Sequence, residues 1–223
     1  MITVHHLNNS RSQRVLWLLE ELGLAYEIRY YQRDHKTLLA PPELRSVHPL
    51  GKSPVITENG LTLAESGAIV EYLVERHGAG RLIPPLGSPE RLRYHYWMHF
   101  AEGSAMPPLL MKLVFDRLER APMPFIARPI ARSLGNRVRR SFIDPQLRTQ
   151  LNFMESELAR STWFAGPEFT AADIQMSFPL EAAAARAGLD ATRPRLMGFL
   201  GHIHAREAYQ RALEKGGPFA LAR

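Results

Sequence analysis

Residues 51–67, GKSPVITENGLTLAESG, contain two short apolar runs joined by Asn59-Gly60. An Asn-Gly pair between two such runs is a strong signal for a tight β-hairpin. Pro54 stands at the entrance of the first run, where proline has no backbone N–H to donate to a strand ladder. We therefore expect a hairpin whose entrance, at Ser53 and Pro54, leaves backbone groups for an extended, peptide-like ligand.

The residues on either side of this hairpin predict the rest of a small domain. Ile2–Leu7 is a short, β-branched strand candidate, the periodic run SQRVLWLLEELGL predicts a helix that ends at Gly23, and AYEIRYY predicts a second strand. At most one short helix precedes the hairpin, and ESGAIVEYLVERHG after it predicts an amphipathic helix ending at Gly78. The order βαβαββα indicates a mixed sheet with helices on its faces.

A proline-bearing connection follows, and beyond it no β-rich run occurs. Apolar periodicity there predicts helices alone: residues 91–120 with a bend near Pro107-Pro108, residues 144–160, a helix that begins at Ala171, and residues 193–213. The predicted fold is therefore α/β plus all-α. We place a small α/β domain at residues 1–80, a linker at 81–88 and an all-helical domain at 89–223.

Composition and charge narrow the possible functions. The 223 residues include no cysteine, which excludes disulfides, thiolate metal ligands and a cysteine nucleophile. The N-terminal segment lacks the features of a secretion signal and no apolar run approaches ~18 residues, so we expect a cytoplasmic protein without a membrane span. The formal net charge is +6.

Part of that charge comes from arginines that are not interleaved with base-stacking aromatic residues, so we expect a solvent-exposed helical face or loop and no nucleic-acid partner. These arginines are Arg128, Arg132, Arg137, Arg139, Arg140 and Arg148.

Four segments, SRSQRVLWLLEELGL, HPLGKSPVI, LTLAESGAIVEYLVERHG and FTAADIQMSFP, resemble the cytosolic glutathione transferases in order and spacing. The resemblance covers essentially the whole chain. It implies a thioredoxin-like N-terminal domain that binds glutathione and a helical C-terminal domain that holds an apolar electrophile. It further implies a transferase that uses glutathione as co-substrate without a metal and acts in detoxification. Together with the apolar helix faces, it predicts a homodimer.

Five residues around the hairpin are the expected glutathione-binding residues. A cis Ser53–Pro54 bond would turn the chain sharply and present the Ser53 N–H and C=O to an extended tripeptide. Ser66, at a helix N-terminus, can hold a carboxylate through its hydroxyl and the free N–H groups, while Glu65 can pair with an ammonium group. Lys52 could meet the second carboxylate. A plain helix cap is the alternative for Glu65 and Ser66.

The thiol of glutathione must ionise before it can attack an electrophile. A hydroxyl or amide donor near a helix N-terminus stabilises the thiolate anion. The loop HHLNNSRSQR contains neither tyrosine nor cysteine, so a serine-type or asparagine-type member is expected. Ser10 is the first candidate for this catalytic role. Asn9 is the second, because counting back from the helix can place it where serine-type members carry their serine. Ser12 is expected to cap the helix.

Two other side-chain pairs have ordinary explanations. His95 and His99 are four residues apart on one predicted helix, but no third ligand is evident, so we expect no metal site. Thr170 and Asp173 have the spacing of a capping box ahead of an apolar helix, and we assign them to folding.

Trp97, Phe100 and Ser104 recur at helical spacing and could line the electrophile site, although a core stripe is the favoured interpretation. The same fold supports other reactions. A glutathione-dependent peroxidase, isomerase or dehalogenase therefore stays open, as does a regulatory module that binds glutathione without turnover.

Overall fold

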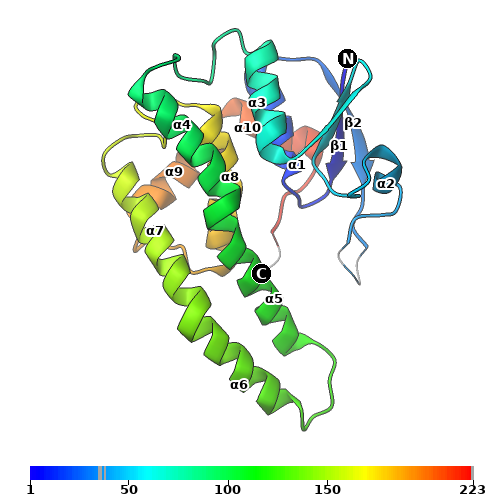
Figure 1. Ribbon diagram of the computed structural model, residues 1–223, viewed down its shortest axis with the longest axis vertical. Coiled ribbons are helices and arrows are strands. Elements are labelled where there is room, and N and C mark those ends of the chain that lie inside the picture. Colours follow the sequence, from blue (N-terminus) through cyan, green and yellow to red (C-terminus); the bar gives the residue numbers. More distant parts are fainter. Residues whose placement is uncertain (35–36, 38, 222–223) are drawn as a thin grey trace.

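The computed structural model describes residues 1–34, 37 and 39–221. Its N-terminal part confirms the predicted order βαβαββα (Figure 1). The elements are β1 (Ile2–Leu7), α1 (Ser12–Leu22), β2 (Tyr26–Tyr31), α2 (Leu44–Val47), β3 (Val55–Glu58), β4 (Leu61–Ala64) and α3 (Ser66–His77).

The four strands form one mixed sheet in the order β2-β1-β3-β4. β1 runs parallel to β2, as a strand–helix–strand unit requires, whereas β3 is antiparallel to both β1 and β4. Asn59 and Gly60 adopt φ values of 49° and 83° in the tight turn between β3 and β4. Left-handed backbone at both central residues is what the Asn-Gly pair predicts for a two-residue hairpin loop.

The rest of the chain is helical, as predicted. The helical elements are α4 (Pro89–Phe100), π-helix η1 (Ala101–Ala105), α5 (Met106–Arg120), α6 (Arg128–Val138), π-helix η2 (Arg139–Ile143), α7 (Asp144–Leu158), α8 (Ala171–Arg186), α9 (Pro194–His204) and α10 (Glu207–Gly216).

The predicted bend in the helix over residues 91–120 is the π-helical segment η1, which lies just before Pro107 and Pro108. Because proline has no N–H, Pro108 cannot bond the carbonyl of Ser104 four residues earlier. The Gln150 amide donates to that carbonyl instead, at 2.8 Å. A wide turn at η1 therefore lets both prolines stand in the first turn of α5.

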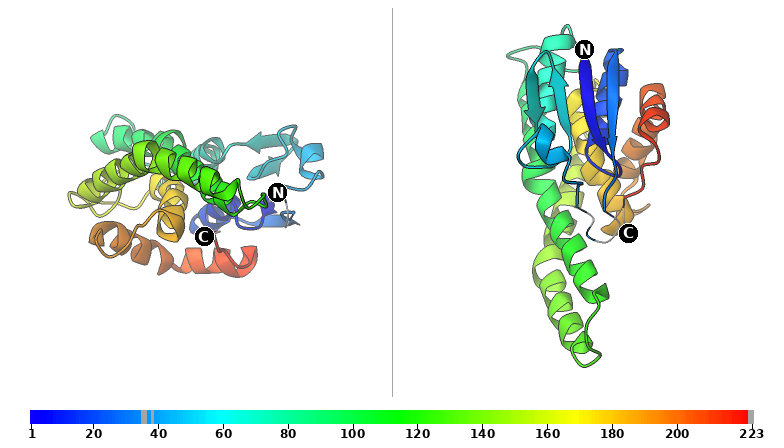
Figure 2. Two further views of the ribbon diagram at one scale, coloured as in Figure 1. Left: turned by 90° about the horizontal axis from the view of Figure 1, so that it is seen from below. Right: turned by 90° about the vertical axis from the view of Figure 1, so that its right-hand side faces the viewer.

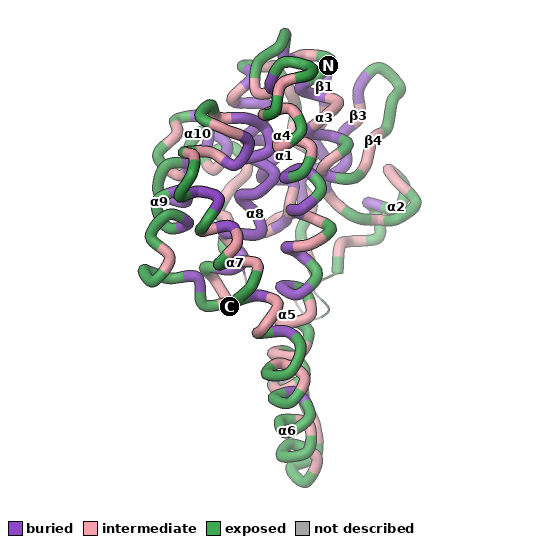
Figure 3. Tube along the Cα trace, turned by 60° about the vertical axis from the view of Figure 1, so that its left-hand side comes forward, coloured by how far each residue is buried: buried purple, intermediate pink, exposed green. Residues whose placement is uncertain are grey.

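Two expectations about the helices were wrong. Residues 193–213 form two helices, α9 and α10, because the chain is extended at Arg206, whose guanidinium group pairs with Glu21 of α1 at 2.6 Å. Helix α6 was not predicted as a separate element. It forms a hairpin with the distal half of α5 that projects from the body of the molecule and is largely exposed (Figures 1 and 3).

Arg139, which directly follows α6, stabilises this hairpin. It pairs with Asp116 of α5 at 2.6 Å and with Glu119 of α5 at 2.5 Å. The other arginines of residues 128–140 are exposed, which agrees with a solvated helical face.

The sheet domain and the helical domain pack closely against each other. Helix α1 lies between the sheet and helices α8 and α10, as the views in Figure 2 show. Trp17 of α1 is buried there against Phe169 and Tyr209, with ring centroids 5.8 and 5.1 Å apart. This packing fixes the start of α1, and hence the preceding loop, relative to the helical domain.

Candidate functional site

The predicted binding residues meet at one end of the sheet. Val55 pairs with His5 of β1 on one side and with Ala64 of β4 on the other. One step further along these registers, Pro54 comes opposite Glu65, and Ser53 comes beside the end of β1. The loop between β1 and α1, the entrance of β3 and the start of α3 therefore lie together.

The Ser53–Pro54 peptide bond is cis. Pro54 is buried, Ser53 is half-buried and Lys52 is exposed. The Ser53 hydroxyl donates to the His5 carbonyl at 2.9 Å, which ties this turn to the central strand. The Ser53 hydroxyl is therefore used within the protein. The backbone N–H and C=O of Ser53 are the groups that can bind a ligand.

The N-terminus of α3 lacks the side-chain cap that the alternative interpretation requires. Glu65 occupies the N-cap position with φ 72° and ψ 122°, and its side chain makes no capping hydrogen bond. Ser66 is the first helical residue and only 4% exposed. A left-handed backbone at a non-glycine residue is strained, and such strain is concentrated at ligand-binding positions.

The hydroxyl of Ser10 is buried in a chain of hydrogen bonds. Ser10 is 3% exposed, its Oγ lies 2.7 Å from Ser12 Oγ, and it accepts from the Ser12 backbone N–H at 3.2 Å. Ser12 Oγ in turn lies 2.9 Å from His6 Nδ1, and His6 Nε2 lies 3.0 Å from the Gly216 carbonyl.

The direction of these hydrogen bonds follows from the last one. A carbonyl only accepts, so His6 Nε2 carries the proton. Burial lowers the pKa of His6, although the Gly216 carbonyl opposes this, so the ring is neutral and Nδ1 can accept from Ser12. The single proton of the Ser12 hydroxyl can go to His6 Nδ1 or to the Leu7 carbonyl at 3.3 Å, and in either case Ser12 Oγ can accept the proton of Ser10. In this arrangement the Ser10 hydroxyl donates to Ser12 and not to a ligand.

The expected cap at Ser12 is wrong. The N-cap residue of α1 is Arg11, which makes no side-chain capping bond, and Ser12 is the first helical residue. Its hydroxyl instead accepts from the backbone N–H of Leu7 at 3.2 Å, on β1. Ser12 therefore joins α1 to the strand before it.

Asn9 has a different orientation from its neighbour. It is half-buried, with φ 50°, and its Oδ1 accepts from the Ala220 backbone N–H at 2.8 Å. Since the amide oxygen is engaged, the NH₂ group is the end that can donate to a ligand. The preceding Asn8 is bound to Arg33, whose backbone N–H donates to Asn8 Oδ1 at 2.8 Å.

An ion pair between the two domains holds the loop between β1 and α1 in place. The sequence analysis did not predict this pair. Arg14 of α1 is 2% exposed and pairs with Glu102 of η1 at 2.5 Å, while Arg11 reaches the same carboxylate at 3.0 Å. Burial raises the pKa of Glu102, but Arg14 and Arg11 outweigh it and bring the pKa below its ordinary value. A charged residue directly before the apolar run Val15–Leu19 was the signal that could have revealed this pair.

Gln175 of α8 is a second residue that the sequence did not reveal. Its backbone carbonyl accepts from Arg14 Nη1 at 2.5 Å. Its buried amide has no hydrogen-bond partner at either end within the part of the chain that the structure describes. The amide nitrogen lies beside Gly67 in the first turn of α3, where a methyl group on Gly67 would be 3.7 Å away.

The remaining candidates have structural roles. Thr170 and Asp173 form the predicted capping box of α8, with Thr170 N–H donating to Asp173 Oδ2 at 2.8 Å. Trp97 and Phe100 belong to the helical core, where the Trp97 ring lies 4.6 Å from that of Phe164. The Ser104 carbonyl accepts from Gln150 as described above.

His95 Nε2 accepts from Arg91 Nε at 3.1 Å on the same helix. Among the described residues, no group of three or more His, Cys, Asp or Glu side chains could hold a metal ion.

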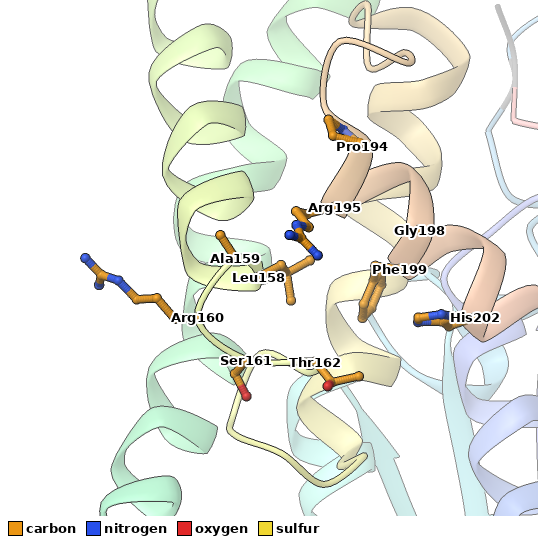
Figure 4. Close-up of a pocket in the computed structure, with 10 residues that line it drawn as sticks. All are labelled: Leu158, Ala159, Arg160, Ser161, Thr162, Pro194, Arg195, Gly198, Phe199 and His202. Carbon is orange, nitrogen blue, oxygen red and sulfur yellow. The ribbon is translucent and has the colours of Figure 1, made fainter.

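A pocket of about 370 Å³ lies between the end of α7 and helix α9 (Figure 4). Its lining includes Arg160, Arg195 and His202, and none of the predicted site residues belongs to it. The pocket therefore lies outside the candidate site, which is built from the loops at the end of the sheet.

Family comparisons agree with this geometry. The family models described as "Glutathione S-transferase, N-terminal domain" and "Glutathione S-transferase, C-terminal domain" match residues 1–75 and 143–207. The chain belongs to the glutathione S-transferase family. This confirms the resemblance that the sequence motifs indicated, and it confirms the thioredoxin-like and helical domains.

Two fungal transferases are similar in sequence. Glutathione S-transferase 3 of Schizosaccharomyces pombe is 40% identical over 82% of this chain and 74% of its own length. Glutathione S-transferase 1 of Saccharomyces cerevisiae is 32% identical over 96% of this chain and 95% of its own.

Two solved structures are similar in fold. A glutathione S-transferase from Actinobacillus pleuropneumoniae has a TM-score of 0.79 and 31% identity over 97% of this chain and 93% of that one. A sphingomonad glutathione S-transferase, solved in complex with glutathione, has a TM-score of 0.72 and 25% identity over 96% and 98% of the two chains. No helix in the described part of the present chain is long and apolar enough to cross a membrane.

Proposed function

We propose that this transferase binds glutathione at the end of the sheet and conjugates its thiolate to an electrophile. The observation that carries the proposal is the uncapped N-terminus of α3, whose residues Glu65 and Ser66 lie in register with the cis Ser53–Pro54 turn. Main-chain groups at Ser53 suit the extended tripeptide, the α3 N-terminus suits one carboxylate, and Lys52 suits the other.

For activation of the thiol we favour Asn9 over Ser10. The Asn9 NH₂ group is the end of the amide that can donate to a ligand, whereas the buried Ser10 hydroxyl shares a hydrogen bond with the Ser12 hydroxyl. In the reaction the thiol proton passes to solvent, the sulfur forms a bond to the electrophilic carbon, and the leaving group departs with its electron pair. Asn9 would stabilise the negative sulfur, while Ser10 would hold the loop in position.

Calorimetry of glutathione binding tests the site. Glu65→Ala and Ser66→Ala should each weaken binding by roughly 1.5–3 kcal/mol, the usual contribution of a hydrogen bond to a charged group. Thr62→Ala, in exposed β4 of the same hairpin, is the matched control and should bind as the wild type does. Unchanged affinity in both site variants would remove the proposed site.

Peroxidase, isomerase and dehalogenase activities remain alternatives on the same fold, and so does a non-catalytic glutathione-binding module. Turnover assays with hydroperoxides report peroxidase activity, whereas assays with epoxides and aryl halides report attack of the thiolate on carbon. From the family resemblance we also propose a cytoplasmic homodimer that acts in detoxification, with the domain division at residues 1–80, 81–88 and 89–223. Cell fractionation tests the location, and limited proteolysis within residues 81–88 tests the division.

A further inference from the structure

A separate pocket of about 200 Å³ lies among helices α8, α9 and α10 and the last described residues of the chain. In Figure 1, the chain runs from α10 to the C-terminus beside α8. The lining of the pocket includes Glu181, Leu200, His204, Tyr209, Phe219 and Leu221. No residue proposed to bind glutathione or to activate its thiol lines this pocket, so it is distinct from the candidate site.

Glu181 of α8 brings a nearly buried carboxylate to the pocket, since its side chain is only 9% exposed. Its Oε1 accepts from the Tyr209 hydroxyl at 2.6 Å and lies 3.1 Å from His204 Nε2. Its Oε2 has no hydrogen-bond partner within the part of the chain that the structure describes. A carboxylate can accept about four hydrogen bonds, and burial without partners is costly. The second oxygen is therefore the atom to which a ligand can donate.

The groups around Glu181 leave its negative charge without a permanent counterion. Among the described residues, no lysine or arginine lines the pocket. Burial and the neighbouring Glu181 raise the pKa of Tyr209, so its hydroxyl keeps the proton and is uncharged. An imidazole such as that of His204 loses any positive charge as the pH rises. A ligand that is both a hydrogen-bond donor and a cation would satisfy the oxygen and the charge together.

The rest of the pocket favours a small apolar body. The His204 and Tyr209 rings lie with their centroids 4.9 Å apart, and Phe219 adds a third ring to the lining. A cation over the face of an aromatic ring gains a further attraction. Leu200 and Leu221 contribute apolar surface. The volume of about 200 Å³ is below the roughly 300 Å³ at which pockets for drug-sized ligands begin, so the body is small.

The C-terminal wall of the pocket lies next to the candidate site. Phe219 and Leu221 line the pocket, and between them the backbone N–H of Ala220 donates to Asn9 Oδ1 at 2.8 Å. The two sites are therefore neighbours that share no proposed binding residue. A ligand in the pocket can be present together with glutathione, which distinguishes it from an amine bound at Glu65.

We propose that this pocket binds a primary ammonium group carried on a small apolar body, with Glu181 as the acceptor. The ammonium group donates to Glu181 Oε2, and the apolar body lies against Leu200 and Phe219. No bond is made or broken. The inference is independent of the proposed conjugation, because the pocket contains none of the residues assigned to that reaction.

A matched pair of compounds tests the proposal. Cyclohexylamine and cyclohexanol have the same ring, but only the amine is a cation at about pH 8, where an aliphatic ammonium group keeps its proton. Each is titrated into the full-length protein, and binding is followed by the shifts of backbone amide signals in NMR spectra. We expect saturable shifts centred on Tyr209 and Phe219, with the amine bound at least about tenfold more tightly than the alcohol.

Glu181→Gln keeps the shape of the side chain and an oxygen for Tyr209 but removes the charge. It should weaken binding of the amine about tenfold or more and leave binding of the alcohol nearly unchanged. Ala184→Phe, at another lining position, should fill the pocket and prevent binding of both compounds. Glu207→Gln is the matched control, because Glu207 of α10 is 95% exposed, and it should bind the amine as the wild type does.

Equal affinities for amine and alcohol in the wild type would overturn the proposal, as would wild-type affinity for the amine in Glu181→Gln. If Glu181→Gln fails to fold, Ala184→Phe decides, and undiminished binding of the amine there would overturn the proposed site. Saturating glutathione should leave the amine bound. Complete displacement of the amine by glutathione would assign it to Glu65 and would also overturn the proposal.

Discussion

Asn9 and Ser10 show what a sequence can and cannot reveal about single residues. Both are short polar residues in the predicted loop, and counting back from the helix does not distinguish them. The orientation of each side chain depends on its hydrogen-bond partners. The Ala220 backbone N–H binds the Asn9 amide oxygen, and the Ser10 hydroxyl bonds to Ser12, which in turn bonds to His6. Contacts of this kind join positions far apart in the chain, so local sequence patterns do not contain them.

The neutral His6 ring has a consequence for stability at low pH. Its pKa is below the ordinary value of about 6.5, so the folded protein binds fewer protons than the unfolded chain just below that pH. The free energy of unfolding should therefore fall as the pH drops below about 6.5. Above this pH, His6 should add no pH dependence. In His6→Gln, the free energy of unfolding, measured with urea, should depend less on pH between about 5 and 6.5.

His99→Gln provides the control for this experiment, because His99 is an exposed histidine of α4. It should keep the pH dependence of the wild type. An identical slope in His6→Gln and the wild type would show that His6 is not the neutral, buried acceptor described here.

At the level of elements, local signals succeeded where the deciding residues are adjacent in sequence. The Asn59-Gly60 turn, the Thr170–Asp173 capping box and the helix end at Gly23 are all present as predicted. The missed features depend on tertiary contacts. Helix η1 is supported by Gln150 from α7, and the break between α9 and α10 depends on the pair between Arg206 and α1.

The ion pair between α1 and η1 gives a prediction at the same scale. Glu102→Gln removes the charge that faces buried Arg14, and it should lower the free energy of unfolding by about 2–3 kcal/mol. Glu75→Gln is the matched control, because Glu75 is 61% exposed and lies 3.7 Å from Arg91. Its effect should be below about 0.5 kcal/mol. Equal effects in chemical denaturation would contradict the structural role assigned to Glu102.

The whole molecule combines a compact two-domain body with a projecting hairpin of α5 and α6 (Figure 3). Ile126, Ile130 and Leu134 on this hairpin are 68%, 64% and 59% exposed. A surface of this kind is typical of a protein–protein contact. We accordingly expect a homodimer in sedimentation at micromolar concentration, and a single 25.3 kDa species would contradict this expectation.

The ionisation of bound glutathione tests the central proposal most directly. Ultraviolet absorbance of the thiolate, followed against pH in the saturated complex, gives the pKa of the bound thiol. We predict a value below that of free glutathione in the wild type, with each unit worth about 1.4 kcal/mol of preference for the anion. Asn9→Ala should raise this pKa, and Ser10→Ala should raise it less. Saturating binding with the pKa of free glutathione would contradict a transferase that activates the thiol and would favour the non-catalytic module.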